Sequence, residues 1–154
     1  VVAYDVEYRY RGEVYVSPRV RVIANLDSMP LRIPAGRWLT FLHPEDVPAY
    51  TAAIRAHFRG ATEFFQCEYR VRGKDGSYRW VLDRGLATRG SDGRVHRMAG
   101  SIGDVSHRKD AERRILEAVS KRDAAAARDW MVRHIRDFRK GYELAGIALD
   151  RRIG

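Results

Sequence analysis

The sequence has a single cysteine and no long apolar run, and each shortage excludes a class of protein. Cys67 alone can form neither an internal disulfide nor a cysteine-based zinc site, which suits a reducing, cytoplasmic compartment. No apolar run approaches the roughly 20 residues needed to cross a bilayer, and no signal peptide is visible. An initiator methionine is also absent, so we expect the chain to be part of a longer protein.

Positive charge is in excess, with a net charge of +9 that suggests nucleic-acid binding as one hypothesis. Residues 1–107 hold 16 basic against 12 acidic side chains, and residues 108–154 hold 13 against 8. The excess is therefore denser in the C-terminal part, where opposite charges are interspersed as on a solvated helix. No nucleic-acid-binding motif accompanies it. A basic nucleic-acid-binding module, or a protein–protein interaction module without a ligand, remains the alternative to the function developed below.

Three strands are predicted between residues 63 and 104, because apolar residues alternate with polar ones as in half-buried strands. The pairs Asp75-Gly76 and Asp92-Gly93 separate the three runs, and Asp-Gly favours tight hairpins because both turn positions take positive φ. Together the runs form a β-meander. The apolar side of the first strand carries Phe65, Cys67, Tyr69 and Val71, and that of the second carries Tyr78, Trp80, Leu82 and Leu86.

Upstream of the meander the sequence predicts a hairpin over residues 1–16 and a short helix that starts at Ser17-Pro18. Pro30 and Pro34 then prevent a long helix over residues 25–36.

A second helix is expected between Pro48 and Gly60, with Tyr50, Ile54 and Phe58 along its buried side. Glu45 and Asp46 precede it, where carboxylates favour the positive end of the helix dipole. Structural capping explains these two carboxylates better than acid–base catalysis.

The chain contains no glycine or proline from His107 to Lys140, which predicts one helix of about 33 residues. Such a helix is too long to fold back entirely on a domain of this size. Toward the C-terminus, apolar residues are alternately four and three residues apart, as in a coiled coil. An earlier set of apolar residues in the same predicted helix is out of register with this spacing by one residue. The predicted dimer seam consists of Trp130, Met131, Ile135, Phe138 and Tyr142.

Several short motifs follow one another along the chain in a characteristic order and spacing. They are His43-Pro44-Glu45-Asp46, Glu68-Tyr69-Arg70, Asp75-Gly76-x-Tyr78-Arg79-Trp80, Arg84-Gly85, Asp92-Gly93 and Gly100-x-x-x-Asp104-Val105-Ser106-x-Arg108-Lys109. Together they resemble the PAS family of sensory domains over about residues 3 to 112. The last motif resembles the closing PAC motif, and the first fits a His-Pro-Glu-Asp subgroup.

The resemblance implies an α+β fold, with a five-stranded antiparallel sheet flanked by short helices. Residues 1–106 would form the sensory domain and residues 107–154 a C-terminal signalling and dimerisation helix. The implied function is regulatory: a sensor module of a larger, cytoplasmic signalling protein. It would act as a homodimer and relay a signal to an output domain, such as a histidine kinase or nucleotide cyclase. Residues Asp104, Ser106 and Arg108 would carry that relay, and no catalytic site is expected in this chain.

A small apolar ligand could lie in the core of such a domain, and the candidate lining consists of Trp38, Phe41, Leu42, His57, Phe58, Phe65, Tyr69, Trp80, Leu82 and Met98. The alternative is a filled core. No cofactor is expected. Flavin-binding relatives place a reactive cysteine on a helix in a motif that is absent here, so Cys67 is interpreted as a buried apolar residue.

Histidine is the remaining candidate ligand. His57 lies near the position of the haem ligand in haem-binding relatives, but a histidine at a helix edge is the simpler interpretation. His43 is explained by the cap before Pro44, and His96 and His107 lack the spacing of a metal site. His134 lacks the flanking sequence of a phospho-accepting histidine.

Overall fold

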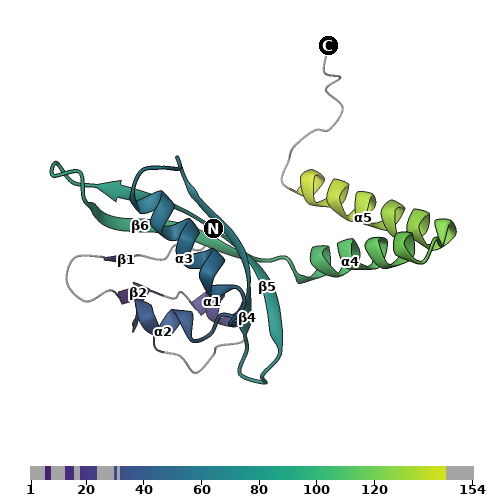
Figure 1. Ribbon diagram of the computed structural model, residues 1–154, viewed down its shortest axis with the longest axis horizontal. Coiled ribbons are helices and arrows are strands. Elements are labelled where there is room, and N and C mark those ends of the chain that lie inside the picture. The colour runs from purple at the N-terminus through teal and green to yellow at the C-terminus, as the bar shows by residue number, and fades with distance from the viewer. Residues whose placement is uncertain (1–5, 8–12, 16–17, 24–29, 31, 145–154) are drawn as a thin grey trace, which may run out of the picture. The chain divides into compact units, whose positions relative to one another are not determined.

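The computed structural model describes residues 6–7, 13–15, 18–23, 30 and 32–144. It divides into two compact units, Val1–Val105 and Ser106–Gly154, each of which is considered by itself (Figure 1). In the described helices, no segment is both long enough and apolar enough to span a membrane.

The predicted meander is confirmed as an antiparallel sheet of β4 (Phe65–Arg72), β5 (Tyr78–Arg89) and β6 (Val95–Asp104). Gly76 and Gly93 adopt φ angles of +81° and +72° in the two connections, whereas Asp75 and Asp92 do not take the positive φ predicted for them. Glycine alone supplies the left-handed position of each turn. Asp75 Oδ1 accepts a hydrogen bond from the Ser77 amide at 3.0 Å, which stabilises the first turn.

A second antiparallel sheet, in the order β1-β2-β3, contains β1 (Val6–Glu7), β2 (Glu13–Tyr15) and β3 (Arg32–Pro34). The predicted N-terminal hairpin is present, since Val6 pairs with Val14. β1 lies beside β6, but the ladders among the described residues form two three-stranded sheets and not one sheet of five strands. The additional strand β3 tolerates proline because it is at a sheet edge, and it buries Ile33.

Three helices accompany these strands: α1 (Pro18–Ile23), α2 (Ala35–Leu39) and α3 (Val47–Phe58). The predicted stripe of α3 is confirmed, because Tyr50, Ile54 and Phe58 pack against the core. Tyr50 meets Phe65 and Tyr69 of β4 edge-on, with ring centroids 5.7 and 5.0 Å apart. Gly60 ends α3 with a φ angle of +80°, which is the left-handed conformation of a helix C-terminus.

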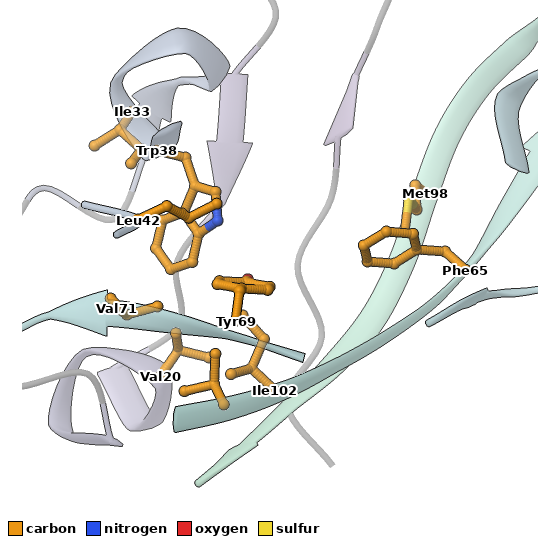
Figure 2. Packing of buried hydrophobic residues seen from close by; sticks show 10 residues of the cluster. Val20, Ile33, Trp38, Leu42, Phe65, Tyr69, Val71, Met98 and Ile102 are labelled. Carbon is orange, nitrogen blue, oxygen red and sulfur yellow. The ribbon is translucent and has the colours of Figure 1, made fainter. Parts of the chain in front are cut away.

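The core lies between these helices and one face of the meander, and Figure 2 shows Tyr69 near the centre of the labelled side chains. The predicted inward face of β4 is confirmed for Phe65, Tyr69 and Val71. The buried apolar residues are Val20, Ile33, Trp38, Leu42, Phe65, Tyr69, Val71, Val81, Met98 and Ile102.

The predicted apolar face of β5 is the wrong one for the core. Val81 and Asp83 are buried, whereas Trp80 and Leu82 are only half-buried and Leu86 is 59% exposed. Register explains the difference, because residues that pair across antiparallel strands point to the same side. Tyr69 pairs with Val81 and Cys67 with Asp83, so these β5 residues share the core face of β4. The larger apolar residues of β5 lie on the opposite face.

The single helix predicted after residue 107 is also wrong. The second unit holds two antiparallel helices, α4 (Ser106–Ser120) and α5 (Ala124–Leu144), joined by a tight turn (Figure 1). Arg122 takes a left-handed φ of 56°, and the amide of Asp123 donates to the Ala118 carbonyl at 2.9 Å. This is a Schellman-type helix end built without glycine. Asp123 then caps α5 by accepting a hydrogen bond from the Ala126 amide at 2.9 Å.

Candidate functional site

The predicted core lining separates into two groups. Trp38, Leu42, Phe65, Tyr69 and Met98 are buried together with His57, and Phe41 and Phe58 pack against the same cluster from its edge. Trp80 and Leu82 belong to the opposite face of the sheet, where the guanidinium of Arg70 lies 5.2 Å from the Trp80 ring centroid. The two β5 residues are therefore removed from the candidate lining, and the other eight remain in or beside the core.

A buried polar pair, which the sequence did not predict, crosses this core. The Tyr69 hydroxyl donates to Asp83 Oδ2 at 2.7 Å, and the two residues are 0% and 1% exposed. A buried carboxylate is costly unless donors compensate for the lost water, so this hydrogen bond is needed in the folded state. The strand register places Asp83 opposite Cys67 on the core side, which the sequence alone did not indicate.

Cys67 is half-buried and lies beside this carboxylate. Burial, together with the negative charge of Asp83, raises the pKa of the Cys67 thiol to about 11. The thiol is therefore protonated at neutral pH and is a poor nucleophile.

His57 is buried, contrary to the helix-edge position predicted for it, and both of its ring nitrogens have partners. Nε2 accepts a hydrogen bond from the Ala87 amide at 3.0 Å, so Nδ1 carries the proton and donates to the Thr62 carbonyl at 3.1 Å. Iron coordination at Nε2 would break the link to β5, so this histidine does not fit the role of a haem ligand. Among the described residues, no cluster of three or more His, Cys, Asp or Glu could hold a metal ion.

The two carboxylates before α3 have a different role from the predicted helix cap. Asp46 makes no side-chain cap to α3, and its oxygens instead accept hydrogen bonds from Arg70 of β4. The Arg70 amide and Nε donate to Asp46 Oδ2 at 2.8 and 2.9 Å, and Nη2 donates to Oδ1 at 2.7 Å. Glu45 adds a more exposed contact to Nη2 at 2.9 Å. The cluster therefore joins the start of α3 to the edge of the sheet.

The electrostatics of the cluster follow from this geometry. Burial alone would raise the pKa of Asp46, but the hydrogen bonds and positive charge of Arg70 outweigh it, and the pKa is lowered from its usual value of 3.8. Hydrogen bonding and charge from the same cluster raise the pKa of Arg70 further above its usual range. Both groups are thus fully ionised at neutral pH.

Replacing Asp46 with asparagine should make the free energy of unfolding of the domain less dependent on pH in the acidic range. Because the pKa of Asp46 is lower in the folded protein, its contribution is complete above the unfolded value near 3.8 and is lost as pH falls through the folded value. Asp46→Asn should lower the free energy of unfolding by about 1–2 kcal/mol at neutral pH. The difference from the unsubstituted protein should shrink below about pH 4, as urea unfolding at several pH values would measure.

Glu45→Gln is the matched control, because the Glu45 side chain binds the same guanidinium but is largely exposed and should matter much less. A difference between the Asp46→Asn protein and the unsubstituted protein that stays constant with pH would contradict the assignment.

The three predicted relay residues flank the end of β6. Asp104 lies 3.6 Å from Arg79 of β5, and the Val105 amide donates to the Trp80 carbonyl at 2.9 Å. α4 begins at Ser106 itself. Within α4, Arg108 donates to Glu112 at 2.7 Å one turn along the helix.

The predicted seam residues occupy two sides of α5. Trp130 is half-buried, and the guanidiniums of Arg114 and Arg133 lie 4.4 and 5.2 Å from its ring centroid. Met131, Ile135 and Phe138 are exposed on α5, together with Val132. Tyr142 is within α5, but its side chain is outside the described part of the structure.

An antiparallel meander with short helices against its inner face defines a class of α+β domains, and here a single residue separates its last strand from α4. The family described as PAS fold matches residues 13–102. The chain therefore belongs to the PAS family. The matched range ends before Asp104, so the closing motif at Asp104-Val105-Ser106 stays a prediction.

Two curated proteins share part of this sequence. The methyl sulfide methyltransferase-associated sensor of Methanosarcina acetivorans is 31% identical over 96 residues, which cover 61% of this chain and 10% of that protein. Hybrid signal transduction histidine kinase A of Dictyostelium discoideum is 29% identical over 132 residues, which cover 81% of this chain and 6% of that protein. The chain thus spans a tenth or less of the length of these relatives.

Solved structures share the fold. A sensory box histidine kinase/response regulator from Burkholderia thailandensis superposes with a TM-score of 0.67 at 31% identity, covering 79% of this chain and 88% of that one. The N-terminal domain of a diguanylate cyclase with a PAS/PAC sensor, from Marinobacter aquaeolei, gives a TM-score of 0.61 at 20% identity, covering 70% of this chain and 97% of that one. At this lower identity, the second likeness concerns the fold alone.

Proposed function

We propose that this chain is the sensory PAS module of a larger signal-transduction protein, and that it relays its state through α4 to an output domain. The observation that carries the proposal is the junction, where a single residue, Val105, separates the end of β6 from the start of α4. The relatives support it, because they are a sensor and a histidine kinase of which this chain matches only a small part. The output domain would be of the kinase or cyclase kind.

The relay would work by shifting the populations of two arrangements of the helix. Asp104 and Val105 are both tied to β5, through Arg79 and the Trp80 carbonyl. A change in the pairing or twist of β5 and β6 would therefore move the residues from which α4 starts. The eight inner residues named above are the surface that a small apolar ligand would contact to cause such a change.

A homodimer is part of the same proposal. Met131, Ile135 and Phe138 leave an apolar stripe exposed on α5, and burying such side chains against a second copy stabilises association. The positive charge of the second unit argues less for nucleic acid, since Arg108 and Arg113 pair with acidic residues along α4. In this proposal the module works in the cytoplasm, and any catalytic step belongs to residues outside this chain.

The junction can be tested with Asp104→Ala. The carboxylate lies just before the start of α4, and its loss also removes the contact to Arg79. We expect amide exchange over residues 106–112 to become about two- to fivefold faster, while exchange in the meander stays unchanged. Hydrogen–deuterium exchange with mass spectrometry measures both regions in one experiment.

Two controls sharpen this result. Arg79→Ala removes the same contact from the other side, and Asp92→Ala removes a carboxylate from the β5–β6 turn at the opposite end of the two strands. Only the first should resemble Asp104→Ala over residues 106–112. Unchanged exchange in Asp104→Ala would remove Asp104 from the relay.

A further inference from the structure

A groove runs between α4 and α5 in the second unit, apart from the PAS core. Its volume is about 380 Å³, which is near the lower limit for small-molecule sites. The half-buried ring of Trp130 forms part of its wall. Most of the other lining residues carry charge, so polar chemistry determines what the groove can hold.

Each carboxylate of the groove lies beside a basic side chain. Asp110 lies 3.7 Å from Arg113 of the same helix, and Asp137 lies 3.9 Å from Nδ1 of His107 on the facing helix. Neither of these two contacts involves an arginine that lines the groove.

Three guanidiniums line the same groove, those of Arg114, Arg133 and Arg136. None of them has a carboxylate within ion-pair distance in the part of the chain that the structure describes. The Trp130 ring orients two of them, since its centroid lies 4.4 Å from Cζ of Arg114 and 5.2 Å from Cζ of Arg133. Stacking engages the face of a guanidinium and leaves the N–H groups at its edge available for hydrogen bonds.

We propose that this groove binds the phosphate group of a small anionic metabolite. Guanidinium edges match tetrahedral oxyanions because each presents two parallel N–H donors to two oxygens. Arg114 and Arg133 approach from different helices, so a bound phosphate bridges α4 and α5. Arg136 supplies further positive charge, and His134 contributes a ring nitrogen. The ligand would then favour the helix hairpin over arrangements in which the two helices separate.

The test uses the full chain and pyrophosphate as the probe, at constant ionic strength in chloride buffer. Backbone amide spectra should show saturable shifts confined to residues 107–114 and 130–137. Arg114→Gln and Arg133→Gln should each weaken binding by about tenfold or more. Arg114→Lys, which keeps the charge but loses the planar fork, should weaken it as well.

Arg128→Gln is the matched control, because it removes an exposed arginine of α5 outside the groove and should leave binding unchanged. Shifts that do not saturate, or equal weakening by Arg128→Gln, would overturn the proposal in favour of general charge screening. Tight binding of duplex DNA that pyrophosphate does not displace would overturn it in favour of a nucleic-acid surface. Circular dichroism of each variant confirms that the helices persist.

Discussion

Replacing Tyr69 with phenylalanine should lower the free energy of unfolding of the PAS unit by about 2–3 kcal/mol. The ring and its packing are retained, but Asp83 loses a hydrogen-bond donor at 2.7 Å in a place that water does not reach. Leaving one partner of a buried hydrogen bond unsatisfied costs about 1–3 kcal/mol, and more when the partner is ionised. Urea unfolding followed by circular dichroism measures the change.

Tyr78→Phe provides the matched control, because it removes the same hydroxyl from an exposed tyrosine on the opposite face of the sheet. Its effect should stay within about 0.5 kcal/mol. If the two substitutions had equal effects, the Tyr69–Asp83 hydrogen bond would not be a stabilising part of the core.

Replacing Ile135 and Phe138 together with glutamate should weaken the proposed dimer by at least about 100-fold. These side chains are 52% and 54% exposed in a single chain, and each contributes about 1.5–3 kcal/mol when fully buried by a partner. A carboxylate in the same interface would lose its hydration without gaining a partner. Light scattering over a range of protein concentrations measures the association.

Lys140→Glu serves as the control, since it introduces a carboxylate at an exposed polar position of the same helix. Helix geometry places it on the side of α5 away from Ile135 and Phe138, so dimerisation should persist. An unsubstituted chain that stays monomeric at high micromolar concentration would refute the dimer, and the groove on the hairpin would be unaffected.

The second unit is a hairpin of two helices and not the predicted single long helix, and this difference changes what the unit can bind. Without glycine or proline, nothing in its local propensity marks a break between residues 107 and 140. The turn is at Arg122, and Asp123 directly after it is a good N-cap residue. That N-cap signal alone could have indicated a new helix start at this position. The turn also brings Arg114 and Trp130 together, which creates the groove.

The sequence alone determined the elements whose cause is local. Two Asp-Gly pairs define the meander turns because glycine takes positive φ at no steric cost, as Gly76 and Gly93 do. Pro18 starts α1 because the first N–H groups of a helix have no intrahelical partner, so proline loses no hydrogen bond at this position. Period-two alternation identified the core face of β4, and four-residue spacing identified the buried stripe of α3. The order and spacing of the motifs also indicated the family.

Only the tertiary structure decided the features that depend on which residues meet. The core face of β5 was set by its register with β4, where a buried Asp83 satisfied by Tyr69 lies inward while Leu82 and Leu86 lie on the other side. Asp46 binds Arg70, 24 residues away, and His57 accepts from the Ala87 amide, 30 residues away. Local propensity carries no information about such partners, because hydrogen bonds between distant residues form only after the chain has brought their elements together.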